Sequence, residues 1–283
     1  MLKNKKIGFI GGGNMGEALV SGLVQSAAAP AANIICSDVR EEPLTELKRK
    51  YGINTTTDNV EVARESEIII YATKPQILAS VLKETAMVLD RSKLIISIAA
   101  GVPLAAIQAG LGKELRLIRV MPNICAFVKE SATAIAAGKR VEKGDVELAK
   151  AIFDSVGISV FIQENTLMDA FTGLSGSGPA YVFLIIDAMA DAGVKMGLSR
   201  KDSLLLSTQT VLGSAKLLLE SKEHPGQLKD RVTSPGGTSI AGIHTLEQGG
   251  LRTTIMDAVE AATNRSRELG KMMIENFRDN DDE

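Results

Sequence analysis

Short apolar runs alternate along the first part of the chain with stretches in which apolar residues recur at helical spacing. A run rich in β-branched residues predicts a buried strand, whereas helical spacing predicts an amphipathic helix. The expected strands are residues 7–10, 34–37, 68–71, 94–98, 115–120, 132–136 and 158–162. The expected helices between them are residues 15–25, 42–51, 76–89, 103–109 and 145–155. Strands that are apolar throughout predict a parallel sheet covered by helices on both faces.

After Glu164 the strand pattern stops, and the remaining sequence predicts helices only. The expected helices are residues 166–174, 178–196, 200–220, 226–232, 239–248 and 251–275, followed by a solvated tail over residues 278–283. Some of these helices carry wide apolar faces, as in residues 181–186 (YVFLII) and 203–206 (SLLL). Such faces favour a second subunit as their cover. The alternative is that they pack against the first part of the same chain.

The composition is that of an ordinary globular protein, with 283 residues, 45% hydrophobic residues and a formal net charge of -2. That charge gives no basic field for nucleic acid or for an anionic membrane, and neither partner is expected. The two cysteines, Cys36 and Cys125, lie in apolar segments and are expected to be small buried side chains in a reducing compartment. No targeting segment or membrane span is expected, so the predicted location is the cytoplasm.

One segment, residues 6–16 (KIGFIGGGNMG), joins an apolar strand to Gly11, Gly13 and Gly16 and then to a helix. This arrangement predicts a dinucleotide site for NAD, NADP or FAD, with the pyrophosphate at the helix N-terminus. We therefore expect residues 1–163 to form a Rossmann-like, doubly wound parallel sheet that binds NAD(P). Residues 164–283 are expected to form an all-helical domain for substrate binding and dimerisation.

The second expected strand ends at Ser37, Asp38 and Arg40, where such a fold reads the adenosine ribose. Asp38 would accept hydrogen bonds from a free 2′-hydroxyl and favours NAD, whereas Ser37 and Arg40 could hold a 2′-phosphate and favour NADP. The sequence leaves both nucleotides open, and it leaves open whether Arg40 is simply a solvated charge at a helix start.

Three further segments follow expected strands at the edge where open parallel sheets bind ligands. They contain Thr73, Lys74 and Pro75; Ala99, Ala100 and Gly101; and Met121, Pro122 and Asn123. The small residues of the second segment would let a nicotinamide ring lie close to the backbone. Each segment alone is equally consistent with ordinary turn chemistry.

The helical half contains two segments rich in glycine and serine, residues 173–181 (GLSGSGPAY) and 232–239 (VTSPGGTS), each before an expected helix. The second offers hydroxyls and flexible backbone N–H groups, which suit the carboxylate of a small acid. The alternative is a pair of helix caps. Neither His224 nor His244 has the context of a general base, and the sequence shows no metal-ligand cluster or nucleophile motif.

These segments together resemble pyrroline-5-carboxylate reductase over almost the whole chain. The resemblance rests on residues 7–16, 74–75, 99–102 (AAGV), 119–123 (RVMPN), 174–181 (LSGSGPAY), 191–197 (DAGVKMG), 224–229 (HPGQLK) and 233–238 (TSPGGT). It implies hydride transfer from NADPH or NADH to the C=N bond of 1-pyrroline-5-carboxylate, the last step of proline biosynthesis. It also implies a homodimer that assembles further into a ring such as a decamer.

The expected site residues combine the motifs with this resemblance. The predicted substrate site comprises Ser234, Gly236, Gly237, Thr238 and Ser239, with Thr238 and Ser239 catalytic and Ser239 near the ring nitrogen. The predicted cofactor site comprises Gly11, Gly12, Gly13, Asn14, Met15, Gly16, Ser37, Asp38, Arg40, Asn59, Ala72, Thr73, Lys74, Pro75, Ala99, Ala100 and Gly101. Ser239 departs from the family, which commonly has threonine there, so the hydroxyl is kept but its rotamer is less constrained.

Two other functions would use some of the same residues. A β-hydroxyacid dehydrogenase would have a catalytic lysine and an asparagine where this chain has Val182 and Ile186, with Lys195 as a weak substitute for the base. A non-catalytic nucleotide sensor would have no need of the Ser234–Ser239 anion loop. Both alternatives are therefore less favoured than the reductase.

Overall fold

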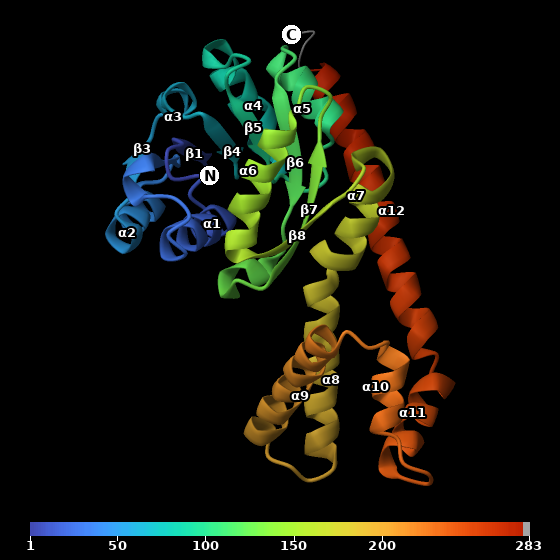
Figure 1. Ribbon diagram of the computed structural model, residues 1–283. Helices are drawn as coiled ribbons and strands as arrows, with labels where there is room; N and C mark the ends of the chain where they lie inside the picture. The colour runs from blue at the N-terminus through green and yellow to red at the C-terminus, as the bar shows by residue number, and fades with distance from the viewer. Residues whose placement is uncertain (280–283) are drawn as a thin grey trace. The chain divides into compact units, whose positions relative to one another are not determined.

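The computed structural model describes residues 1–279 and contains one eight-stranded sheet (Figure 1). The strand order is β3-β2-β1-β4-β5-β6-β7-β8. The bounds are β1 Ile7–Ile10, β2 Ile34–Ser37, β3 Asn54–Thr56, β4 Ile68–Tyr71, β5 Leu94–Ser97, β6 Arg116–Met121, β7 Ser131–Ala137 and β8 Gly157–Phe161. All seven expected strands are present, with ends that differ by at most one residue, but β3 was not predicted. Its sequence, Asn-Thr-Thr, is too short and polar to show a strand pattern.

The sheet is parallel from β3 through β6, and then its direction reverses. In the central pairs, Ile7 lies opposite both Ile34 and Ile68, whereas β7 runs antiparallel to β6, with Ile118 opposite Ala137. The predicted parallel sheet is therefore confirmed except for the pair β6 and β7, since β8 again pairs parallel with β7. Residues 122–130 join β6 to β7, and they are too few for the crossover that a parallel pair requires.

Helices cover both faces of the sheet, as a doubly wound fold requires. One apolar core joins the sheet to α1 (Asn14–Gln25), α2 (Glu41–Tyr51) and α6 (Lys143–Phe153). The other joins it to α3 (Asn59–Glu65), α4 (Pro75–Thr85) and α5 (Leu104–Leu111), with Met273 and Ile274 packed against it. The sequence did not reveal α3, which begins where the Asp58 carboxylate accepts hydrogen bonds from the N–H groups of Val60 (2.8 Å) and Glu61 (3.2 Å).

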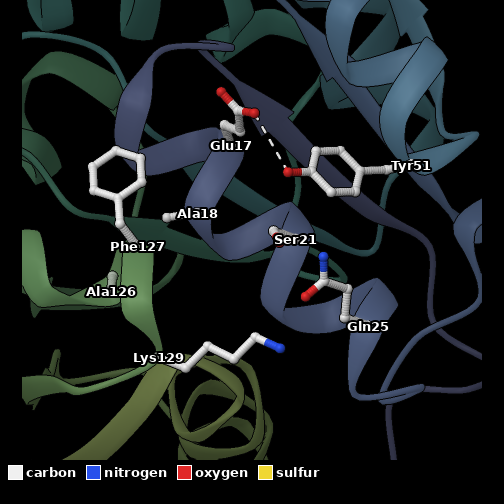
Figure 2. A pocket seen from close by; sticks show the side chains of 8 residues that line it. All are labelled: Glu17, Ala18, Ser21, Gln25, Tyr51, Ala126, Phe127 and Lys129. Atoms are coloured by element: carbon white, nitrogen blue, oxygen red, sulfur yellow. Dashed lines mark hydrogen bonds between the residues drawn. The ribbon is translucent and has the colours of Figure 1, made fainter.

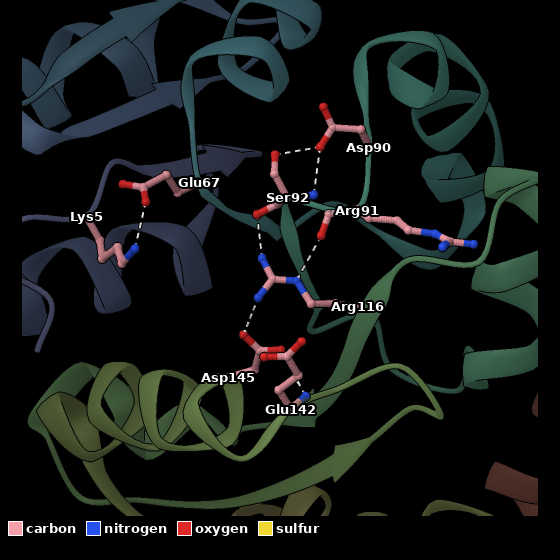
Figure 3. Close-up of polar contacts among 8 residues, drawn as sticks. All are labelled: Lys5, Glu67, Asp90, Arg91, Ser92, Arg116, Glu142 and Asp145. Atoms are coloured by element: carbon pink, nitrogen blue, oxygen red, sulfur yellow. Dashed lines mark hydrogen bonds and ion pairs between the residues drawn. The ribbon is translucent and has the colours of Figure 1, made fainter.

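A polar cluster fixes the edge of the sheet at which β6 begins (Figure 3). The Arg116 guanidinium contacts the buried Asp145 carboxylate at 2.7 Å and also donates to the carbonyl oxygens of Arg91 and Ser92. Asp145 in turn accepts from the N–H of Glu142 at 3.0 Å, which completes the capping box of α6. This cluster joins three loops and lies at the sheet edge away from the glycine turn, so its role is structural.

The later helices are α7 (Glu164–Phe171), α8 (Gly178–Lys195), α9 (Arg200–Ser221), α10 (Pro225–Arg231), α11 (Thr238–Gln248) and α12 (Leu251–Asp279). The predicted helix 166–174 instead begins at Glu164 and becomes a π-helical turn over Thr172–Gly176. By contacts the chain divides into one compact unit of Met1–Gly176 with the segment from Ala261 onward, and a second unit of Ser177–Glu260. The first two residues of the expected tail, 278 and 279, belong to α12. Its last four residues, 280–283, lie outside the described residues.

Apolar side chains of the helical unit remain exposed in the single chain, among them Phe183, Leu184 and Leu205. By length and composition, one helical stretch among the described residues, 167–195, would suffice to cross a bilayer, although it contains three aspartates. Only 11% of its most apolar window is buried within the chain. An exposed apolar surface of this kind is typical of a contact with another surface.

Candidate active site

The turn between β1 and α1 requires glycine at two positions. Gly11 has a φ of +110°, and a Cβ there would lie 2.7 Å from the carbonyl oxygen of Ala72. A Cβ at Gly16 would lie 2.4 Å from the carbonyl oxygen of Gly11, so only glycine lets α1 approach the turn this closely. The first glycine makes the turn and the third brings the helix against it, as the sequence motif predicted.

The N-terminus of α1 is left open for an anion. Its N-cap residue, Gly13, offers no side chain to the first N–H groups of the helix, and a Cβ at Gly13 would meet no atom within 4 Å. Unpaired N–H groups and the helix dipole at such an end favour a phosphate. The glycine turn therefore fits the pyrophosphate of a dinucleotide.

The end of β2 forms a tight polar cluster around Asp38. One oxygen of its carboxylate accepts from the N–H of Gly12 at 3.0 Å, and the other accepts from the N–H (3.0 Å) and Nε (3.2 Å) of Arg40. Ser37 is fully buried and donates to Asn59 Oδ1 at 2.7 Å, while Asn59 Nδ2 donates to Glu84 at 2.9 Å. The negative Asp38 carboxylate thus lies beside the glycine turn, and Arg40 is already paired with it.

Replacing Asp38 with asparagine is expected to shift nucleotide preference toward NADPH. The amide oxygen can still accept from Gly12, but the negative charge that would repel a 2′-phosphate is removed and Arg40 is released. We expect the ratio of the NADPH and NADH dissociation constants to fall by about tenfold, or roughly 1.4 kcal/mol. Fluorescence titration with each nucleotide measures the two dissociation constants.

Glu42→Gln is the control, because it removes an exposed charge from the first turn of α2. An equal change in the affinity for both nucleotides in Asp38→Asn would contradict a role of Asp38 in nucleotide preference.

A cavity of about 390 Å³ lies where β4, β5 and β6 end. Seven of the predicted cofactor residues line it: Asn14, Met15, Ala72, Thr73, Pro75, Ala99 and Ala100. Met121, Pro122 and Asn123, which the sequence placed at this edge of the sheet, also line it, whereas Ile98, Ile124 and Phe127 were not assigned to the site. Gly176, from the π-helical turn, completes the lining. The walls are mainly apolar, which suits the face of a nicotinamide ring.

Two polar groups of this cavity differ in how their hydrogen bonds are satisfied. Asn123 is fixed, since its Nδ2 donates to the carbonyl oxygen of Ser175 at 3.1 Å and its Oδ1 accepts from Cys125 N at 3.1 Å. Thr73 Oγ1 is buried and lacks a hydrogen-bond partner within residues 1–279. An orphaned hydroxyl in a cavity wall indicates a ligand that supplies the partner. The cavity therefore fits the nicotinamide end of the dinucleotide, and Thr73 would bind it.

The remaining predicted cofactor residues lie outside the cavity lining. Gly11, Gly12, Gly13 and Gly16 form the turn described above, and Ser37, Asp38, Arg40 and Asn59 form the β2 cluster. Lys74 is the exposed N-cap of α4, and Gly101 follows β5 with a φ of +73°. Their contacts with a nucleotide stay predictions.

Candidate acids and metal ligands are scarce around this cavity. Tyr71 is buried and its OH lies 2.6 Å from Thr85 Oγ1; burial raises the pKa of Tyr71 to about 12, so it remains a neutral phenol. Burial, aided by the Asp38 carboxylate, raises the pKa of the Cys36 thiol to about 12. Cys125, expected to be buried, is only half-buried because it lies on the short 3-10 helix Ile124–Val128. The described part of the chain contains no cluster of metal-ligating residues.

The predicted substrate loop belongs to the helical unit. Gly237 is the N-cap of α11, its N–H donates to the carbonyl oxygen of Ser234 at 3.1 Å, and Gly236 has a φ of +66°. Thr238 and Ser239 are the first two residues of α11. Among the described residues, the hydroxyls of Ser234, Thr238 and Ser239 have no hydrogen-bond partner, so they are available to a ligand. The structure thus brings the five predicted substrate residues together at one helix start.

Both histidines of this unit are unsuited to proton transfer. His224 caps α10, with its Nδ1 accepting from the N–H of Gly226 at 3.1 Å, and His244 is exposed on α11. Val182 and Ile186 on α8 supply no base. The hydroxyls at the start of α11 are therefore the candidate substrate groups of this unit, and their role stays a prediction.

A second hollow of about 250 Å³ lies between α1, Tyr51 of α2 and residues 126–129 (Figure 2). Its polar wall contains Glu17, which accepts hydrogen bonds from Lys50 Nζ at 2.9 Å and from Tyr51 OH at 3.4 Å. Phe127 lines both this hollow and the cavity of about 390 Å³ described above.

The sheet order, the glycine turn and the cavity define a Rossmann-type oxidoreductase that uses NADP or NAD. Residues 6–101 match the family model described as NADP oxidoreductase, coenzyme F420-dependent, and residues 165–269 match the model for pyrroline-5-carboxylate reductase dimerisation. The chain belongs to the pyrroline-5-carboxylate reductase family, as the motifs predicted.

Individual relatives match over nearly their full length. A pyrroline-5-carboxylate reductase from Methanosarcina acetivorans is 52% identical over 95% of this chain and 100% of the relative. The solved reductase from Coxiella burnetii has a TM-score of 0.90 at 38% identity, over 94% of this chain and 99% of that one. The Plasmodium falciparum enzyme, solved with NADP bound, has a TM-score of 0.85 at 37% identity, over 95% and 100%.

Proposed function

We propose that this chain reduces 1-pyrroline-5-carboxylate to L-proline with NADPH or NADH, the last step of proline biosynthesis. The observation that carries the proposal is the combination of a dinucleotide turn with a separate anion site of free hydroxyls at the start of α11. Relatives that match along almost the whole chain carry the same name. A nucleotide sensor would need only the first of these two sites.

The substrate chemistry explains why the protein can lack a strong acid or base. A cyclic imine protonated at nitrogen is already electrophilic, and a bound nicotinamide supplies the hydride that neutralises it. The remaining task is to hold the substrate carboxylate and orient the ring. Ser234, Gly236, Gly237 and Thr238 would hold the carboxylate, and the Ser239 hydroxyl would accept a hydrogen bond from the ring N–H.

The β-hydroxyacid dehydrogenase alternative fails on the same ground. Oxidation of an alcohol needs a base to take the hydroxyl proton, and Val182 and Ile186 occupy the positions where that class places lysine and asparagine. Lys195 lies at the other end of α8, at its C-terminus, and is exposed. This contrast supports reduction of an imine over oxidation of an alcohol.

The assembly that we propose is a homodimer through the helical region, with dimers joined in a ring such as a decamer. The match to a dimerisation model and the exposed apolar residues of α8 and α9 support the dimer. The same cover would account for the apolar stretch 167–195 without a membrane. Residues 1–163 would bind the nucleotide and residues 164–283 the substrate and the second copy. Two free cysteines fit a reducing, cytoplasmic location.

The test is the loss of nicotinamide absorbance when purified protein is mixed with 1-pyrroline-5-carboxylate and NADPH, and then with NADH. Turnover with either nucleotide supports the proposal. Tight nucleotide binding without turnover would contradict it and would favour another imine substrate or a sensor.

A further inference from the structure

The two edges of the sheet differ in how they are protected. At one edge, β3 is short and polar, with the sequence Asn-Thr-Thr. At the other, β8 has the sequence Gly-Ile-Ser-Val-Phe, without a charge or a proline. Ile158 and Val160, on one face of β8, are 64% and 47% exposed, and Phe161, on the other face, is 48% exposed; we call these three residues the β8 patch. Edge strands are normally blunted by shortness, charge or proline, and β3 follows that rule whereas β8 does not.

The nearest helices of the same unit leave the β8 patch uncovered. Val160 lies opposite Ala134 of β7, and Met168 of α7 packs on Ala134 and Ala136. On the other face Ser159 bonds to Asp154 at 2.6 Å, close to the end of α6. An uncharged strand with exposed β-branched and aromatic residues is a template for further pairing. A cover for β8 is therefore expected in the working protein.

The position of β8 in the chain indicates what covers it. Residues 162 and 163 alone separate β8 from α7, and the dimerisation match begins at residue 165. The β8 patch is thus continuous with the segment that forms the homo-oligomer, and Leu167 of α7 is also exposed. A second copy brings exposed apolar residues of its own, such as Phe183 and Leu184.

We propose that the β8 patch is part of the homo-oligomer contact and is covered by a second copy of this chain. The nucleotide-binding unit then takes part in assembly through its sheet edge, in addition to the helical region. This proposal does not depend on which imine is reduced.

Hydrogen exchange of the wild-type chain gives the direct test. Mass spectrometry of peptides over residues 157–162 is compared at protein concentrations at which the oligomer is intact and at which it has dissociated, as sedimentation velocity defines them. We expect slower exchange of the outward-facing N–H groups in the oligomer, and no change over residues 54–56. Exchange over 157–162 that is independent of oligomeric state, whether fast or slow, overturns the proposal; slow exchange would indicate a cover from the chain's own helical unit.

A charge substitution gives a second, independent measurement. Val160→Lys places an ammonium on the patch and is expected to weaken association at least tenfold, whereas Thr55→Lys on β3 is the matched control and should leave it unchanged. Sedimentation velocity measures both, with circular dichroism to confirm folding. Wild-type association of a folded Val160→Lys variant overturns the proposal. If that variant unfolds, hydrogen exchange of the wild-type chain decides the question.

Discussion

Replacing Glu164 with alanine is expected to lower the free energy of unfolding by about 3–5 kcal/mol. Glu164 Oε1 accepts from the Arg119 guanidinium at 3.0 Å and from the N–H of Leu104 at 2.7 Å. The side chains of Arg119 and Glu164 are only 5% and 11% exposed. Glu164 Oε1 thus connects α7 to both β6 and α5. Its loss would leave the buried Arg119 cation without a counterion and the N–H of Leu104 without an acceptor.

Urea unfolding followed by circular dichroism, at one fixed protein concentration, measures this loss. Glu114→Ala is the control, since the side chains of Glu114 and Arg140 are 60% and 57% exposed and their pair should contribute little to stability. Replacing both buried partners, as Arg119→Met with Glu164→Leu, should recover much of the stability because no unpaired charge remains. A cost for Glu164→Ala no larger than that of Glu114→Ala would show that the buried pair is not structural.

Replacing Ser239 with alanine is expected to reduce turnover by roughly 10- to 100-fold, the effect of losing one hydrogen bond to a charged group. Ser239 is the second residue of α11, and its hydroxyl has no partner among residues 1–279. If it bonds the ring nitrogen during hydride transfer, its loss acts on the reaction and not on the nucleotide. The dissociation constant for NADPH should therefore change by less than about twofold.

Steady-state kinetics and fluorescence titration separate these two effects. Ser239→Thr keeps the hydroxyl and is expected to retain activity close to that of the wild-type chain. Thr245→Ala on the same helix is the control. The Thr245 hydroxyl donates to the carbonyl oxygen of Ala241 at 3.2 Å, so it is already paired within the helix. Parallel losses of turnover and NADPH affinity in Ser239→Ala would indicate that the loop has only a structural role.

Elements with a regular local pattern could be predicted from the sequence. The strands rich in isoleucine, such as β1, β4 and β5, were placed within one residue, and the glycine turn was assigned correctly from spacing alone. By contrast, β3 and α3 were missed. β3 consists of three polar residues and carries no hydrophobic period, and α3 has only seven residues. The reversal at β7 was also missed, although the shortness of the connection over residues 122–130 could have indicated it.

The candidate site divides in the same way. Motifs located Ala72, Thr73, Ala99 and Ala100 at strand ends, and the cavity confirms that they meet there. Phe127 and Gly176 could not be placed, since a short 3-10 helix and a π-helical turn bring them to the cavity. The pairing of Arg40 with Asp38 was likewise hidden, because the residue types alone do not tell whether a charge is free or paired.

The sequence by itself determined the class of fold, the dinucleotide turn and the family, because each rests on residues close together in the chain whose chemistry is local. The positive φ of Gly11 and the close approach of Gly16 to the carbonyl oxygen of Gly11 both lie within the turn itself. Only the tertiary structure decided which distant groups pair: Arg119 with Glu164, and Ser37 with Asn59. It also decided which edge of the sheet remains open at β8. Such features depend on how the chain closes on itself, and no local pattern of residues encodes that closure.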